Sequence, residues 1–150
     1  ELGGAVKNVM AVATGICDGL QLGNKARASL INRGLAEMMR LGAALKAKPE
    51  TLMGLAGAGD LNMTSTGDLS RNRQLGILLG DGKTLEQALE KIGQVVEGVN
   101  SSAEVQRLAL ELNINMPISE QVNGIIHKGW DPVEGVARLL AREQKAEHGE

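Results

Sequence analysis

The first 20 residues constrain the fold most, because they combine helical spacing with many small side chains. Val6, Val9, Met10, Ala13 and Ile16 recur every three or four positions, which predicts a helix from about residue 3 to about residue 20. Alanine and glycine recur between these positions, so neighbouring elements can approach on several sides. A helix that is apolar on every face is normally buried. We therefore expect this helix to lie at the centre of the fold.

The rest of the chain repeats the helical spacing, without alternating segments that would predict strands. Further helices are predicted over residues 25–45, 49–55, 70–79, 85–92, 102–112, 117–127 and from 132 onward. Asn24, Thr84 and Ser102 are the expected N-caps, and Thr84 begins a capping box with Gln87. Residues 56–68 are rich in Gly, Ser, Thr and Asp and predict a loop. The sequence thus predicts an all-α, multi-helix domain around a central buried helix.

The composition restricts how that domain can build its core. Phe and Tyr are absent and Trp130 is the only aromatic residue, so the core must consist of Leu, Ile, Val, Met and Ala. A chain of 150 residues suits one domain. We predict a helical domain over residues 1–142 and a charged, frayed tail over residues 143–150. The start at Glu1, without Met, is expected of a fragment or an edited domain.

Charge and cysteine usage exclude several classes of protein. The net charge of -2 argues against a polybasic nucleic-acid binder, and no apolar run approaches the ~20 residues of a membrane span. The single Cys17 rules out an internal disulfide and fits a reducing, cytoplasmic location. His127 and His148 lack a cluster of Cys or carboxylate residues, so we expect no metal site.

Lys7 is the first candidate for chemistry. It lies in the apolar helix, one turn from Gly3 and Gly4. Burial disfavours the charged form of a lysine, so Lys7 could exchange a proton near neutral pH. The alternative is that Lys7 extends its ammonium group to water over an apolar stem.

Three further segments offer polar groups, each with an ordinary structural alternative. Asp60 follows Gly57-Ala58-Gly59 and could hold a substrate hydroxyl or pair with Lys7, or it could simply stabilise a turn. Ser70-Arg71-Asn72-Arg73 opens a predicted helix, whose start could bind an anion. The alternative is that this helix start is only capped and solvated. Glu97 could accept a hydrogen bond from a ribose or an amide, or could cap the next helix.

Five motifs taken together point to a known family. They are Leu-Gly-Gly-Ala-Val-Lys-Asn at 2–8, Leu-Ile-Asn-Arg-Gly-Leu-Ala-Glu-Met at 30–38, Gly-Leu-Ala-Gly-Ala-Gly-Asp-Leu at 54–61, Leu-Ser-Arg-Asn-Arg at 69–73, and Gly-Gln-Val-Val-Glu-Gly at 93–98. Met116-Pro117-Ile118 follows. In this order, and over nearly the whole chain, they resemble the C-terminal, substrate-binding domain of bacterial NAD(P)-dependent glycerol-3-phosphate dehydrogenase. The resemblance implies a fold of the 6-phosphogluconate dehydrogenase C-terminal-like type.

The resemblance also implies a reaction and roles for individual residues. The family interconverts glycerone phosphate and sn-glycerol 3-phosphate by hydride transfer with NAD or NADP, for glycerophospholipid synthesis. Lys7 matches the group that donates or accepts the proton. The positions that match substrate-binding residues are Asn8, Asp60, Thr64, Ser70, Arg71 and Asn72. The positions that match residues lining the cofactor are Arg71, Val95 and Glu97.

The chain also departs from the family pattern. No Gly-x-Gly-x-x-Gly unit follows a strand, so the N-terminal Rossmann domain is absent from these residues. We therefore expect no tight binding of NAD or NADP, and no turnover by the chain alone. Positions where the family usually has aromatic residues read Leu22, Leu52, Leu75, Val99 and Asn123, which suggests an edited natural domain.

Separation from a Rossmann partner should expose an interface around Val6, Leu61 and Met63. An exposed apolar face favours self-association, so we predict a homodimer. The sequence also allows an alternative from a different class of protein. In that alternative, the chain is an engineered helical scaffold or self-assembling dimer module without catalysis.

Overall fold

The computed structural model describes residues 2–45 and 67–147, with side chains through residue 141. Every regular element in these ranges is an α-helix, which confirms the all-α prediction. The helices are α1 (Leu2–Gly19), α2 (Asn24–Ala44), α4 (Gly67–Gly80), α5 (Leu85–Ile92), α6 (Glu97–Glu111), α7 (Pro117–His127) and α8 (Pro132–Glu147). The predicted helix over 49–55 lies outside the described residues. Within the described ranges, none of the helices is long and apolar enough to cross a membrane.

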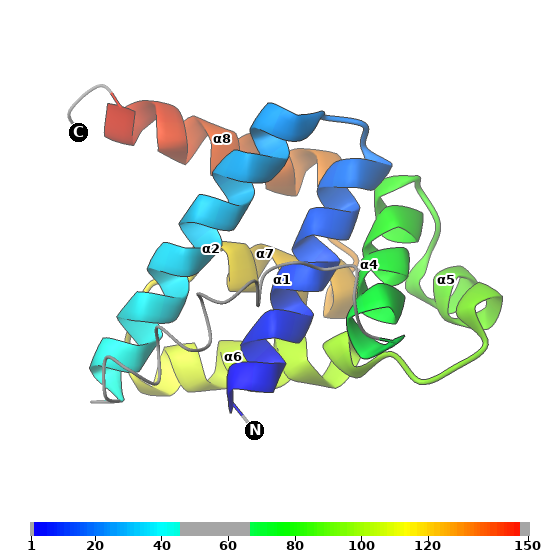
Figure 1. Cartoon of the computed structure of the whole chain (residues 1–150), viewed down its shortest axis with the longest axis horizontal. Coiled ribbons are helices and arrows are strands. Elements are labelled where there is room, and N and C mark those ends of the chain that lie inside the picture. Colours follow the sequence, from blue (N-terminus) through cyan, green and yellow to red (C-terminus); the bar gives the residue numbers. More distant parts are fainter. Residues whose placement is uncertain (1, 46–66, 148–150) are drawn as a thin grey trace.

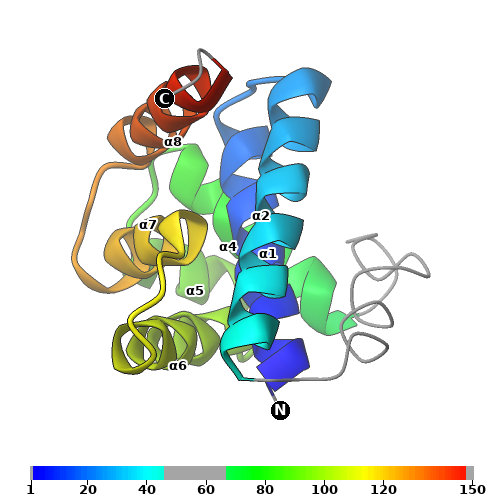
Figure 2. The ribbon, with the colours of Figure 1, turned by 90° about the vertical axis from the view of Figure 1, so that its left-hand side faces the viewer.

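Helix α1 is the centre of the fold, as predicted. It packs against α2, α4, α6 and α7, and Figure 1 shows it between α2 and α4. In Figure 2, α2 overlaps α1, against which it packs, and α8, α7 and α6 are stacked from top to bottom to the left of this pair. Twelve of the 18 residues of α1 are buried, so every face of the helix has a neighbour. Val6 is among them at 5% exposure. The prediction that Val6 lies on an exposed interface was therefore wrong, and Leu61 and Met63 lie outside the described residues.

Helices α1 and α4 touch through their backbones. A Cβ atom added to Gly15 would stand 2.2 Å from the carbonyl oxygen of Arg73, and one added to Gly76 would stand 2.1 Å from that of Val12. Real Cβ atoms are not found at such distances. The small residues of α1 thus serve the close approach that the sequence predicted.

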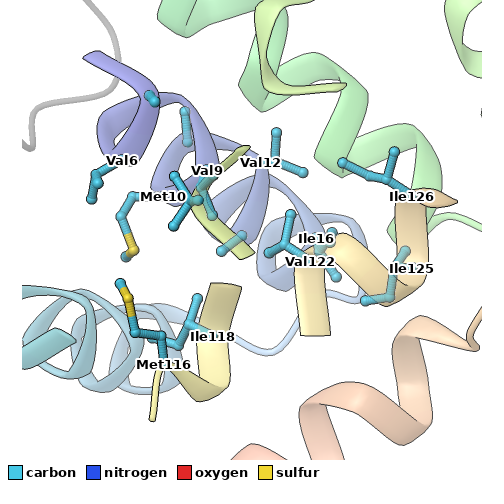
Figure 3. Close-up of a cluster of buried hydrophobic side chains, with 14 of the residues drawn as sticks. Val6, Val9, Met10, Val12, Ile16, Met116, Ile118, Val122, Ile125 and Ile126 are labelled. Carbon is cyan, nitrogen blue, oxygen red and sulfur yellow. The ribbon is translucent and has the colours of Figure 1, made fainter. Parts of the chain in front are cut away.

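The core is aliphatic. Figure 3 shows the apolar side chains of α1 meeting those of α7 in one cluster. Its labelled members are Val6, Val9, Met10, Val12, Ile16, Met116, Ile118, Val122, Ile125 and Ile126. Trp130 is only partly buried, and it packs where a Cβ atom on Gly124 would stand 2.0 Å from its ring. Leu, Ile, Val, Met and Ala therefore build the core in place of Phe and Tyr.

Several helix starts follow local sequence signals. The capping box is present: the Thr84 hydroxyl accepts the N–H of Gln87 at 3.1 Å, and the Gln87 side chain accepts the N–H of Thr84 at 3.0 Å. Asp131 accepts the N–H of Val133 at 3.1 Å at the start of α8. That helix continues through residues 143–147, which belong to the segment that the sequence predicts to be a frayed tail.

Three predicted starts were wrong. Gly23, at φ 91°, precedes α2 in place of Asn24, and makes no side-chain cap. Helix α4 begins at Gly67, three residues before Ser70. Helix α6 begins at Glu97, and Ser102 lies inside it, where its hydroxyl donates to the Val99 carbonyl at 2.9 Å.

Candidate functional site

A buried row of hydrogen-bonded side chains joins α1, α4 and α6. Asn72 of α4 is fully buried. Its Oδ1 accepts the N–H of Gly98 at 2.8 Å, and its Nδ2 donates to Asn8 Oδ1 at 2.9 Å. Asn8 Nδ2 donates in turn to Ser101 Oγ at 3.1 Å. Asn8 and Asn72, both predicted to bind substrate, are thus in direct contact although 64 positions separate them.

Asn72 is also the cap of α6. Gly98 is the second residue of that helix, so its N–H has no carbonyl partner within the helix. Val96, at the N-cap position, makes no side-chain hydrogen bond. Asn72 supplies the missing acceptor from another helix. One buried side chain therefore sets both the start of α6 and the position of Asn8.

Arg71, the neighbour of Asn72, is half-buried and lies over the link between α5 and α6. Its Nε donates to the Val95 carbonyl at 3.2 Å, and its Nη1 donates to Gln94 Oε1 at 3.1 Å. Its Nη2 forms an ion pair with Asp68 in the first turn of α4. The structure thus brings Arg71 and Val95, two of the predicted cofactor-lining residues, into contact.

The other predicted residues fall into two groups. Lys7, Ser70 and Glu97 adjoin the contacting residues along the chain: Lys7 and Ser70 are half-buried, and Glu97 is exposed as the first residue of α6. Asp60 and Thr64 lie outside the described residues.

The predicted anion site at the start of a helix needs correction. Because α4 begins at Gly67, Ser70 is its fourth residue. The N–H groups without intrahelical partners belong to the first turn, not to residues 70–72. An anion held here would be bound by the side chains of Ser70, Arg71 and Asn72 rather than by their backbone.

Arg73 points away from this site, although it shares a motif with Arg71. Its Nη2 and Nε donate to Asp18 Oδ2 at 2.9 Å and 3.2 Å. Arg27 Nε lies 3.7 Å from the same oxygen. This group ties the end of α1 to α4 and α2, which is a structural role.

Glu37 of α2 caps α7 in the way that Asn72 caps α6. Its carboxylate accepts the N–H of Ile118 at 2.7 Å and that of Ser119 at 3.4 Å, while α7 has no local side-chain cap. Burial raises the pKa of Glu37 to about 7, against the opposing effect of these hydrogen bonds and of Arg40 and Arg33. Glu37 therefore titrates near neutral pH inside the core.

Sequence reasoning missed Ser101, Gln94 and Asp68 as partners of the site. The only signal was the spacing of Gly98, Ser101, Ser102 and Val105, which places small residues on one buried face of α6.

His127 also has a structural role, since its Nε2 lies 2.7 Å from the Val99 carbonyl. Among the residues that the structure describes, no cluster of His, Cys, Asp or Glu could hold a metal ion.

Comparison with known proteins shows which family the chain resembles. The profile of the family described as NAD-dependent glycerol-3-phosphate dehydrogenase C-terminus matches residues 1–137. A glycerol-3-phosphate dehydrogenase [NAD(P)+] of Stenotrophomonas maltophilia is 62% identical over 148 residues, which are 99% of this chain and 43% of that protein. The chain therefore spans less than half the length of this relative, at its C-terminal end.

Solved structures show the same relationship. The crystal structure of glycerol-3-phosphate dehydrogenase from Coxiella burnetii superposes with a TM-score of 0.85 at 50% identity, over 93% of this chain and 43% of that one. Plasmodium falciparum glycerol-3-phosphate dehydrogenase shares the fold, with a TM-score of 0.73 at 23% identity over 91% of this chain and 40% of that one. None of these matches supports the alternative of an engineered scaffold. The chain belongs to the NAD-dependent glycerol-3-phosphate dehydrogenase family and corresponds to its C-terminal domain.

Proposed function

We propose that this chain is the substrate-binding half of an NAD(P)-dependent glycerol-3-phosphate dehydrogenase, acting on glycerone phosphate and sn-glycerol 3-phosphate for glycerophospholipid synthesis. The observation that carries the proposal is the contact between Asn8 and Asn72. It joins the segment of α1 that contains Lys7 to the segment of α4 that contains Arg71. This contact supports a site in which a group able to transfer a proton and a group able to bind phosphate act on the same substrate.

Arg71 is the proposed phosphate ligand. A guanidinium group offers paired donors that match phosphate oxygens. Its present partner Asp68 has a side chain that is 63% exposed, and an exposed ion pair contributes only about 0–1 kcal/mol. A phosphate group can therefore replace Asp68 at small cost. The Ser70 hydroxyl and the Asn72 amide are proposed as neutral donors beside it.

Lys7 is the proposed proton-transfer group. As the carbonyl of glycerone phosphate becomes an alcohol, its oxygen must gain a proton, and a lysine ammonium can donate it. In the reverse direction the neutral amine takes that proton back. Asn8 is proposed to hold the substrate beside Lys7. Asp60 and Thr64 are assigned to substrate binding because of the motif in which they occur.

The cofactor would meet the link between α5 and α6. Val95 is 71% exposed and its carbonyl is already bound to Arg71, while Glu97 is exposed two residues later. An arginine beside an exposed apolar residue fits an anionic dinucleotide, so Arg71, Val95 and Glu97 are the residues proposed to contact NAD or NADP. The nicotinamide, when bound, supplies or takes the hydride. We assign the rest of the cofactor site to the N-terminal part of the relatives, which this chain does not match.

A homodimer in the cytoplasm is the remaining part of the proposal. Leu110 and Val133 are large apolar residues exposed on the surface, and such residues favour self-association where they belong to one apolar patch. Free Cys17 suits a reducing compartment. Light scattering should give twice the 15.8 kDa chain mass. A single-chain mass at every concentration would contradict the dimer.

Reconstitution tests the enzymatic proposal. The chain would be mixed with the N-terminal part of the Stenotrophomonas maltophilia relative, and NADH oxidation followed after addition of glycerone phosphate. We expect turnover, and a loss of about 100-fold or more in Lys7→Met, the scale of general acid catalysis. Lys25→Met, which changes an exposed lysine of α2, is the matched control and should keep the activity. Equal activity of the Lys7 and Lys25 variants, or no turnover from a mixture shown to associate, would overturn the proposal.

A further inference from the structure

We infer that Ser101 is a positioning residue, which orients the Asn8 amide toward the bound substrate. The inference rests on the proposed function, because it assigns Asn8 to the substrate. It also extends that function, because Ser101 belongs to none of the motifs through which the chain resembles its family. The argument depends on the direction of the hydrogen bonds in the buried row.

One backbone group sets that direction. The N–H of Gly98 can only donate, so the atom of Asn72 that faces it must be the carbonyl oxygen. Asn72 then donates a hydrogen bond from its Nδ2 to Asn8, and the Oδ1 of Asn8 must accept it. The Nδ2 of Asn8 is left facing α6, where it donates to Ser101 Oγ. The shape of an amide does not distinguish its nitrogen from its oxygen. Here the Gly98 N–H, at the start of α6, fixes the orientation of both amides.

Ser101 completes this arrangement. The residue is only 7% exposed, so an Asn8 amide without the Ser101 oxygen would face a buried surface with no acceptor for that hydrogen. Each Nδ2 carries two hydrogens, and the row engages one of those on Asn8. Asn8 is half-buried, so its second hydrogen has no partner in the row, and we assign that hydrogen to the bound substrate. Ser101 therefore provides the second anchor of the Asn8 amide, on the side opposite Asn72.

The neighbouring serine offers a matched control. Ser102 is fully buried in the same helix, but its hydroxyl donates to the Val99 carbonyl within α6 and lies 3.2 Å from His127 Nε2. It makes no bond to either asparagine in the described structure. Removing the Ser102 hydroxyl therefore deletes a buried polar group from α6 while leaving the row intact.

The test is a pair of NMR measurements on the chain and on its Ser101→Ala and Ser102→Ala variants. The first follows the side-chain NH₂ resonances of Asn8 without ligand. In the unmodified chain the hydrogen that is bonded to Ser101 should exchange slowly with solvent, and Ser101→Ala should shift the NH₂ resonances and speed that exchange. Ser102→Ala should leave them in place. Fast exchange in the unmodified chain, or the same spectrum of Asn8 in both variants, would overturn the inference.

The second measurement titrates sn-glycerol 3-phosphate. Loss of one hydrogen bond should weaken binding about fivefold in Ser101→Ala, and Ser102→Ala should stay within about twofold. Equal weakening in both variants, or none in Ser101→Ala, would refute the positioning role. If the unmodified chain does not bind the ligand, the proposed substrate site fails, and the ligand-free spectra still decide whether Ser101 orients Asn8.

Discussion

Gly76 of α4 packs so closely on Val12 of α1 that a Cβ atom at position 76 would stand 2.1 Å from the Val12 carbonyl oxygen. It would also stand 2.7 Å from the N atom of Ile16. Both obstacles are backbone atoms of the central helix, so they cannot move aside as a flexible side chain would. This contact aligns α1 with α4, and with them the segments that carry Asn8 and Asn72.

Gly76→Ala should therefore destabilise the protein by about 3 kcal/mol or more, because the two helices must separate to admit the methyl group. Gly4→Ala is the control. Gly4 also lies in a helix, but a Cβ atom there would meet nothing within 4 Å, and alanine favours helix by up to about 1 kcal/mol over glycine. Urea denaturation followed by circular dichroism measures both. A Gly76 variant as stable as the Gly4 variant would show that the helices are not in backbone contact.

Glu37 predicts how stability depends on pH. Its pKa is raised in the folded state from 4.5 to about 7, so between these pH values the folded protein holds a proton that the unfolded chain has released. The free energy of unfolding should therefore fall as pH rises through this window. At about 1.4 kcal/mol per pH unit, the fall is on the order of 3 kcal/mol.

Glu37→Gln isolates this contribution. Glutamine keeps a carbonyl oxygen to accept the N–H of Ile118, but it does not titrate. Denaturation of both proteins at pH 5 and pH 8 should show a marked fall for the parent protein and a nearly flat response for the variant. Parallel responses would mean that another group controls the pH dependence.

Asp18 joins α1 to α4 through Arg73, and it should contribute more than an exposed ion pair does. Asp18→Asn should cost about 1 kcal/mol, because the two Arg73 donors lose a charged acceptor in a partly buried position. Glu111→Gln breaks the exposed pair between Arg107 and Glu111, 2.7 Å apart within α6, and should cost less than about 0.5 kcal/mol. Thermal unfolding ranks the two variants. The reverse order would contradict the structural role assigned to Asp18.

Local signals in the sequence were enough to predict some of the helices. The capping box of Thr84 and Gln87 fixed the start of α5, and Pro117 correctly marked the start of α7. The small side chains of α1 correctly indicated a central helix. In each case, the residues that determine the structure lie within a few positions of the element they shape.

The start of α6 was missed because the residue that determines it is distant in the sequence. We expected α6 to begin at a local cap, Ser102, but it begins at Glu97 because Asn72 accepts the N–H of Gly98 from 26 positions away. The same cause hid Ser101, whose partner Asn8 is 93 positions away. The segment 46–66, which contains Asp60 and Thr64, lies outside the described residues, so the predictions for those two residues remain untested.

The most direct test of the substrate-binding proposal is an NMR titration of the chain with sn-glycerol 3-phosphate, compared with Arg71→Ala. Arg107→Ala, which removes an exposed arginine of α6, is the control. The proposal predicts saturable shifts of the backbone amides of residues 70–72 in the parent chain and in the Arg107 variant, and their loss in the Arg71 variant. No shift in the parent chain at millimolar ligand, or the same shifts in all three proteins, would contradict it.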